Sequence, residues 1–224
     1  MTSERHIAVV GTLDTKGEAL EYLRNKIDDQ GCLPILIDIS MKKHMAYKAD
    51  IEAREVVAKA GYKIEEIWES RDRAHASEVM KRGLRVVLHE LLRNKAINAA
   101  VGIGGVSLAN IAADAFKVLP FGMPKIIGVT AAMPVYSSSW FNAQDLAVFQ
   151  TIVEIAGLND LLKAQLDIIA GVACGAARAY NNVFGIKLPH PSVAITDRYR
   201  ACRINRSCFR RKQGRNFRAT GCSS

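Results

Sequence analysis

The stretch of residues 6–18, HIAVVGTLDTKGE, constrains the fold of this chain more than any other. Residues 7–10 form an apolar, partly β-branched run, which is typical of a strand buried on both faces, and Gly11 ends this run. The residues that follow are of types that favour turns and helix N-caps: Thr12, Asp14 and Thr15. From Gly17 onward, apolar residues recur at helical spacing. The stretch therefore predicts a strand, a tight turn and a helix.

A turn of this kind is a candidate anion site. The first N–H groups of a helix lack backbone acceptors, and the helix dipole is positive at that end. Lys16 adds a positive charge to the turn. The alternative is a capped βα connection without a ligand, because the loop matches neither the Walker A pattern nor G-x-G-x-x-G. The expected phosphate-binding residues here are Gly11, Thr12, Asp14, Thr15, Lys16 and Gly17.

Short apolar strands and helices continue to alternate as far as residue 187. Further strands are expected at residues 33–39, 97–103, 125–130 and 146–149. Further helices are expected at residues 51–60, 71–94, 106–116 and 151–180, the last of which is rich in small residues. This alternation predicts an α/β fold, a Rossmann-like three-layer sandwich with a mostly parallel sheet.

Later strand ends supply further candidate ligand-binding residues. Asp38 ends the second strand, where an acid often bonds a ribose hydroxyl. Gly104 and Gly105 follow the third strand and open a second strand–glycine–helix turn. Thr130 ends the fourth strand, and Asp145 is a candidate for holding Mg²⁺ through water, as is the acid of the first turn. We expect one ligand to lie across these carboxyl ends.

The net charge of +9 arises in one segment of the chain. Residues 198–224 hold eight arginines, one lysine and no acid, so the rest of the chain is neutral. Prolines precede residues 192–196, which look like the first strand of another unit, and the sequence then changes abruptly. The expected organisation is a nucleotide-binding domain at residues 1–187 and a truncated second domain with a basic tail at residues 188–224.

Two interpretations of this tail compete. One is a nucleic-acid-binding segment, in which Tyr199, Phe209 and Phe217 lie among arginines. The other is a non-native terminus, such as a frameshifted reading of a longer gene, which the abrupt onset and the scattered cysteines favour. Either way we expect disorder, because the segment has few aliphatic residues and a high net charge.

The remaining composition points to a cytoplasmic protein without membrane contact. No run of about 18 apolar residues occurs, and the polar N-terminus does not resemble a secretory signal. The five cysteines lack CxxC and zinc-site spacing, so we expect reduced thiols, with Cys32 and Cys174 in the core. No Ser-His-Asp or Cys-His arrangement can be placed, so catalytic and metal-ligating residues stay unassigned.

Six sequence segments together resemble a known family in order and spacing: GTLDTKGEALEYLR, LIDIS, the pair Asp72–Arg73, VGIGG, LPFGMPKIIGVT and IVEIAGLN. The family comprises the ATP-binding N-terminal domain of the plant tobamovirus-resistance protein (Tm-one-like) and its bacterial uncharacterised homologues. The resemblance covers about residues 5–186, and its most specific parts are GTLDTKGE and AGLN.

This resemblance implies two Rossmann-like α/β halves, with ATP bound in the first and the second half missing here. The plant relative inhibits viral RNA replication, and the bacterial relatives have no settled activity. The first turn, Asp38 and the glycines of the second turn match the family. Residues 106–109 replace a Ser-Gly-Gly-Thr-type run, and Leu108 is expected to obstruct the close approach of a phosphate. A Thr-Ser-Asp segment is replaced at residues 143–145, which keeps only the acid.

The sequence therefore predicts a nucleotide-binding domain, with ATP as the ligand and Mg²⁺ as an additional candidate. One alternative is a metal-assisted hydrolase or transferase that uses the same cleft. Another is a non-catalytic regulatory module that forms homo-oligomers through the small-residue helix. Nucleic acid is a candidate partner only for residues 198–224.

Overall fold

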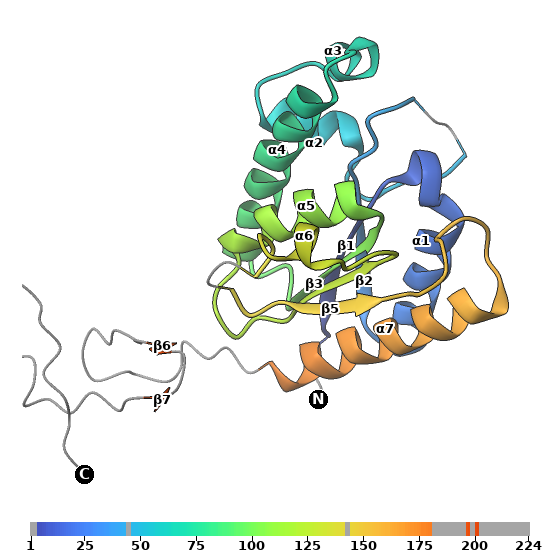
Figure 1. Ribbon diagram of the computed structural model, residues 1–224, viewed down its shortest axis with the longest axis vertical. Coiled ribbons are helices and arrows are strands. Elements are labelled where there is room, and N and C mark those ends of the chain that lie inside the picture. Colours follow the sequence, from blue (N-terminus) through green and yellow to red (C-terminus); the bar gives the residue numbers. More distant parts are fainter. Residues whose placement is uncertain (1–3, 44–45, 142–143, 181–195, 198–199, 202–224) are drawn as a thin grey trace, which may run out of the picture. The chain divides into compact units, whose positions relative to one another are not determined.

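The computed structural model describes residues 4–43, 46–141, 144–180, 196–197 and 200–201 (Figure 1). The chain divides into two compact units, Met1–Gly185 and Ile186–Ser224. In the second unit, the strands β6 (Thr196–Asp197) and β7 (Arg200–Ala201) pair antiparallel. The expected strand at residues 192–196 lies outside the described residues except for its last position, as does most of the basic tail. The domain boundary at residue 187 and the disorder of the tail therefore stay predictions.

The first unit is built on a five-stranded sheet in which every strand is parallel to its neighbours. The strands are β1 (His6–Gly11), β2 (Leu33–Asp38), β3 (Ala99–Gly104), β4 (Lys125–Val129) and β5 (Ala147–Gln150). Their order is β2-β1-β3-β4-β5, so the direction of winding reverses between β1 and β3. The α/β, Rossmann-like fold predicted from the sequence is confirmed.

Helices cover both faces of this sheet (Figure 1). One face carries α1 (Leu13–Asp29) and α7 (Asp160–Ala179), and the other carries α2 (Ala53–Lys59), α4 (Arg73–Arg93) and α5 (Val106–Ala115). The shorter helices are α3 (Ile64–Glu69), η1 (Phe116–Val118) and α6 (Pro134–Ser137). Ile7 and Val9 of β1 pack on the α1 and α7 side, whereas Ala8 and Val10 pack on the α4 and α5 side. A strand with two buried faces needs such a continuous apolar run.

Two helices begin four or more residues away from the expected position. Helix α1 begins at Leu13, before Gly17, and its backbone is non-helical at Lys16, where φ is −128° and ψ is 17°. Helix α7 begins at Asp160, so the expected helix is wrong for residues 151–159. Asn159 caps α7, because its side chain accepts a hydrogen bond from the N–H of Leu162 at 2.9 Å.

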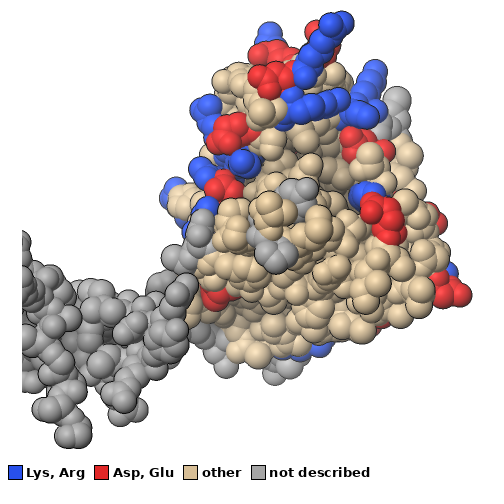
Figure 2. Space-filling view, viewed as in Figure 1, with Lys and Arg blue, Asp and Glu red and all other residues tan. Residues whose placement is uncertain are grey.

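Charged side chains are unevenly spread over the face of the molecule seen in Figure 2. They gather over the end that carries α2, α3 and α4, whereas the area over β5 and α7 is largely uncharged. Among the helices that the structure describes, none combines the length and the apolar character needed to cross a bilayer.

Candidate functional site

A cavity of about 400 Å³ opens at the carboxyl edge of the sheet, between the turns that follow β1 and β3. Eleven residues line it: Thr12, Asp14, Thr15, Lys16, Met41, Lys42, Arg73, Gly105, Val106, Ser107 and Leu108. The strand order reverses between β1 and β3, and ligands of open α/β sheets bind at that reversal point. The volume also falls in the range of small-molecule sites, about 300–1,000 Å³.

The turn between β1 and α1 uses its own backbone donors within the protein. The N–H of Leu13 donates to Asp38 Oδ1 at 3.1 Å, and the N–H of Asp14 donates to Ser40 Oγ at 3.0 Å. The next two N–H groups donate to the carbonyl of Thr12, at 3.3 and 2.9 Å. The expectation of unpaired amides at this turn is therefore wrong, because side chains at the end of β2 and the turn's own carbonyl accept them.

The turn between β3 and α5 differs in this respect. Gly105 is the N-cap of α5 and provides no side-chain acceptor. Within the part of the chain that the structure describes, the N–H groups of Val106, Ser107 and Leu108 have no acceptor. A Cβ added at Gly105 would meet no atom within 4 Å, so open space lies beside these donors. Unpaired amides were expected at both glycine turns, and the described residues show them at the second.

Leu108 has a buried side chain. It is 3% exposed, and a Cβ added at Gly104 would lie 2.9 Å from the Leu108 Cβ. The leucine side chain therefore fills the space beneath the glycines of β3, in the core between α5 and the sheet. The helix thus directs the Leu108 side chain into the core, while Leu108 also belongs to the cavity lining, so its expected effect on a phosphate stays a prediction.

Three cationic side chains belong to the cavity lining. Arg73 is the first residue of α4, and its Nη1 lies 3.5 Å from the carbonyl oxygen of Met41. Lys42 is exposed in the loop after β2. The Nζ of Lys16 forms an ion pair with Glu154 Oε1 at 3.2 Å, and the lysine side chain is 15% exposed. These charges give the site a positive character.

Arg73, Lys42 and Ser107 were not among the residues assigned to the site from the sequence. A signal for Arg73 existed in the Asp72–Arg73 pair, which contributed to the resemblance. Asp72 accepts the N–H of His75 at 2.9 Å and so starts α4. This cap fixes the position at which the arginine leaves the helix.

Asp14 supplies the one carboxylate among the described residues of the lining. Its Oδ1 atom is buried and has no hydrogen-bond partner among those residues. A buried carboxylate oxygen without a hydrogen-bond partner is suited to bind a cation. In nucleotide sites, Mg²⁺ is commonly held by one or two carboxylates together with phosphate oxygens.

Several residues assigned from the sequence lie near the cavity without lining it. A Cβ at Gly11 would overlap Leu20 Cδ1 at 2.2 Å, and a Cβ at Gly17 would overlap the Tyr47 ring at 2.1 Å. A side chain at either glycine would therefore displace Leu20 or Tyr47. Thr130 follows the carboxyl end of β4 but is not part of the lining.

Asp38 and Asp145 serve contacts of the fold. Asp38 is 1% exposed and accepts the N–H of Leu13, so the structure tests no contact between it and a ribose, and that role stays a prediction. Asp145 accepts a hydrogen bond from Lys125 Nζ at 2.7 Å and from the N–H of Gly122 at 2.6 Å. Since Lys125 begins β4, Asp145 lies at the amino edge of the sheet, opposite the cavity.

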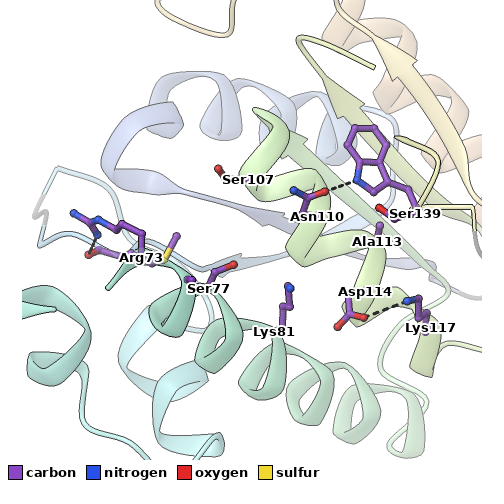
Figure 3. A pocket seen from close by; sticks show the side chains of 12 residues that line it. Arg73, Ser77, Lys81, Ser107, Asn110, Ala113, Asp114, Lys117 and Ser139 are labelled. Atoms are coloured by element: carbon purple, nitrogen blue, oxygen red, sulfur yellow. Dashed lines mark hydrogen bonds and ion pairs between the residues drawn. The ribbon is translucent and has the colours of Figure 1, made fainter. Parts of the chain in front are cut away.

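A second cavity, of about 640 Å³, lies between α4 and α5 (Figure 3). It shares Met41, Arg73 and Ser107 with the first cavity. In Figure 3, Ser77 and Lys81 of α4 face α5 across this groove. No sequence pattern predicts this groove, because both helices were identified only by their apolar faces.

The comparisons with known proteins identify the family. Residues 5–182 match the model of the N-terminal domain of an uncharacterised protein family, UPF0261. A UPF0261 protein of Clostridium tetani is 29% identical over 157 residues, which are 70% of this chain and 39% of the relative. A UPF0261 protein of Brucella suis is 28% identical over 177 residues, which are 79% of this chain and 42% of the relative.

The tomato protein described as ToMV susceptible protein tm-1(GCR26) shows a shorter match, 30% identical over 94 residues, which are 42% of this chain and 12% of the tomato protein. The chain thus spans about two fifths of the length of the bacterial relatives. Because the family model covers most of the chain, this protein belongs to the UPF0261 family, of which it carries the N-terminal domain.

Proposed function

We propose that this domain binds a nucleotide, with ATP as the candidate, and that the phosphates lie at the N-terminus of α5. The observation that carries the proposal is that the N–H groups of residues 106–108 have no acceptor among the described residues and border the cavity at the β1/β3 reversal point. Donors of this kind bind phosphate through hydrogen bonds and the helix dipole.

The surrounding charges support the proposal. Arg73 approaches the same cavity from α4, and a guanidinium can contact two phosphate oxygens at once. Lys42 and Lys16 add positive charge from the loop after β2 and from the first turn. A single charge at a helix end contributes about 0.3–1 kcal/mol, so the amides and cations must act together.

The Asp14 carboxylate is a candidate ligand for Mg²⁺ in this site. A carboxylate on the lining repels a polyphosphate unless a cation lies between them. The Asp14 carboxylate would hold Mg²⁺, directly or through water, and the metal would offset this repulsion. Mg²⁺ should therefore strengthen ATP binding, and Asp14→Asn should weaken this dependence on Mg²⁺.

Calorimetric titration with ATP tests the proposal, with Arg73→Ala compared against Arg71→Ala. Both arginines are exposed, but only Arg73 lines the cavity. We expect binding by the unmodified chain, a loss of about tenfold or more in Arg73→Ala, and little change in Arg71→Ala. Absence of binding by the unmodified chain, or equal loss in both variants, would contradict the proposal.

An enzyme that acts in the same cleft is the alternative. Metal-assisted attack on a phosphoryl group would use the same cations, with Mg²⁺ near Asp14. A turnover assay with ATP and Mg²⁺, run on the chain and on Asp14→Asn, separates catalysis from binding. Release of phosphate that Asp14→Asn abolishes, while ATP binding is kept, would favour the enzyme.

We also propose a second copy of this chain as a partner, through the outer face of α7. Leu161, Ile168 and Val172 are 69, 51 and 37% exposed, and their spacing places them along one side of the helix. A Cβ at Gly171 or Gly175 would meet no atom within 4 Å, so packing within the chain does not require these glycines. Figure 2 shows that this region is largely uncharged.

Light scattering of the chain and of Ile168→Glu tests this partner, because a charge on the apolar face would separate the copies. Monomers in both cases would contradict it. Nucleic acid stays a proposal for residues 198–224 alone, and removal of these residues should abolish any salt-dependent binding to RNA.

A further inference from the structure

The nucleoside part of a bound nucleotide can extend from the phosphate position in either of two directions. A phosphate at the N-terminus of α5 lies next to Ser107, which borders both spaces. The nucleoside part can then extend toward the end of β2 or into the groove between α4 and α5. At the end of β2, Asp38 and Ser40 are each 1% exposed and both accept N–H groups of the first turn, so these two side chains are not open to a nucleoside.

The groove, in contrast, has a volume of about 640 Å³, and a hydrogen bond from Trp140 fixes the orientation of Asn110 in its lining. The indole Nε1 of Trp140 donates to Asn110 Oδ1 at 2.6 Å. Indole nitrogen is only a donor, so the carboxamide must turn its oxygen toward Trp140. Figure 3 shows the amide nitrogen of Asn110 on the other side, away from Trp140 and toward Ser107.

Trp140 holds this orientation firmly. It is 1% exposed and packs in the core of the α4 and α5 face. The carboxamide of Asn110 therefore presents two N–H donors whose direction is set before any ligand arrives, which lowers the entropic cost of binding. Ser77 and Lys81 supply further donors from α4.

On the basis of the proposed function, we infer that the nucleoside part of the ligand lies in the groove between α4 and α5, where the amide nitrogen of Asn110 donates to it. The groove thus selects a ligand whose body carries hydrogen-bond acceptors, as a ribose and a purine ring do. Asp38 then holds the first turn in place and leaves recognition of the nucleoside to Asn110.

Asn110→Asp tests the inference with Asn98→Asp as its matched control. Asn98 Oδ1 accepts the N–H of His6 at 2.9 Å, next to the amino end of β1. Either aspartate keeps the acceptor oxygen of the asparagine and adds one negative charge, but only Asn110→Asp removes donors from the groove. We expect Asn110→Asp to weaken ATP binding about tenfold or more and Asn98→Asp to change it less than about twofold.

Inorganic triphosphate separates the nucleoside contact from the phosphate contact. Asn110→Asp should weaken triphosphate binding less than ATP binding, since triphosphate does not enter the groove. No binding of ATP by the unmodified chain would overturn the proposed function and this inference together. Bound ATP that Asn110→Asp weakens no more than Asn98→Asp, or no more than it weakens triphosphate, would overturn this inference alone.

Trp140 provides a second readout that needs no change at Asn110. The chain has two tryptophans, and Trp68→Phe leaves Trp140 as the only one. Trp68 Nε1 is buried without a hydrogen-bond partner among the described residues, so its removal should be well tolerated. ATP should change the emission of Trp140 and triphosphate should not; ATP that binds without changing this emission would contradict the inference.

Discussion

The carboxylate of Asp38 accepts the backbone N–H of Leu13 at 3.1 Å and thereby closes the first βα turn from the neighbouring strand. The same oxygen accepts the N–H of Ser40 at 2.9 Å. Both contacts are buried, so the end of β2 determines the conformation of a turn that is 25 residues away in the sequence. The first turn therefore has fewer free donors than the turn after β3, which is where we propose that the phosphates bind.

Asp38→Ala should destabilise the fold, because it leaves two buried N–H groups without this acceptor. Each such group costs about 1–3 kcal/mol, so the free energy of unfolding should fall by about 2 kcal/mol or more. Urea denaturation followed by circular dichroism measures this. Asp38→Asn keeps an acceptor oxygen and should lose less; equal stability of the alanine variant and the unmodified chain would contradict the assignment.

The ion pair between Lys125 and Asp145 should prove structural. Lys125 Nζ is buried and also donates to the carbonyls of Pro120 and Met123, at 2.8 and 3.0 Å. Asp145→Asn removes the balancing charge and should lower the free energy of unfolding by about 3 kcal/mol. Weaker binding of Mg²⁺ and ATP at unchanged stability would instead support the role predicted for Asp145 from the sequence.

The stability of the same pair should depend on pH. Burial acts to raise the pKa of Asp145, but the hydrogen bonds from Lys125 and from the N–H of Gly122 outweigh it, so the pKa lies below its ordinary value of 3.8. The resulting stabilisation is complete above the ordinary pKa and is lost as the pH falls through the lower folded-state pKa. Denaturation of the chain between pH 5 and pH 2 should therefore show a loss of stability that Asp145→Asn lacks.

Cys174 should resist alkylation in the folded protein. Burial, together with the neighbouring Cys32, raises the pKa of its thiol to about 12, so the reactive thiolate is scarce at neutral pH. Both cysteines are fully buried. Peptide mapping after iodoacetamide treatment should find neither residue labelled in the native chain and both labelled in urea. Rapid native labelling of Cys174 would contradict the described packing.

The sequence predicted the fold well because its strands are buried on both faces. A run such as residues 7–10 has few alternatives once helices of the right length flank it. The predicted core positions of Cys32 and Cys174 are confirmed for the same reason. The start of α7 was predicted wrongly, because residues 151–159 are apolar enough to belong to the helix. The N-cap at Asn159 is the one feature that places the start at Asp160.

The site was predicted only in part, because its donors depend on contacts between distant residues. Both glycine turns were identified from the sequence, but the sequence does not show that Asp38 and Ser40 accept the N–H groups of the first turn. Likewise, the direction of the Leu108 side chain follows from the packing of α5 on β3. Arg73 lines the cavity only because α4 begins close to the carboxyl end of β1, and no local sequence pattern encodes this placement.

Lys16 should contribute less to binding than its position suggests, because Glu154 already pairs with it. Glu154→Gln releases this charge toward the cavity and should strengthen ATP binding by about twofold to fivefold at low salt. The gain should shrink as ionic strength rises. Calorimetry at two salt concentrations measures both effects, and weaker binding in Glu154→Gln would show that Lys16 acts elsewhere.

The most direct measurement of the central claim is ATP affinity in Gly105→Asp, compared with Gly105→Ala. An aspartate at the N-cap of α5 would accept the free N–H groups itself, adding a few tenths of a kcal/mol to stability. We predict that Gly105→Asp loses ATP binding at least about tenfold while its melting temperature is kept or raised, and that Gly105→Ala still binds. Undiminished ATP binding by a folded Gly105→Asp would contradict the phosphate site at α5.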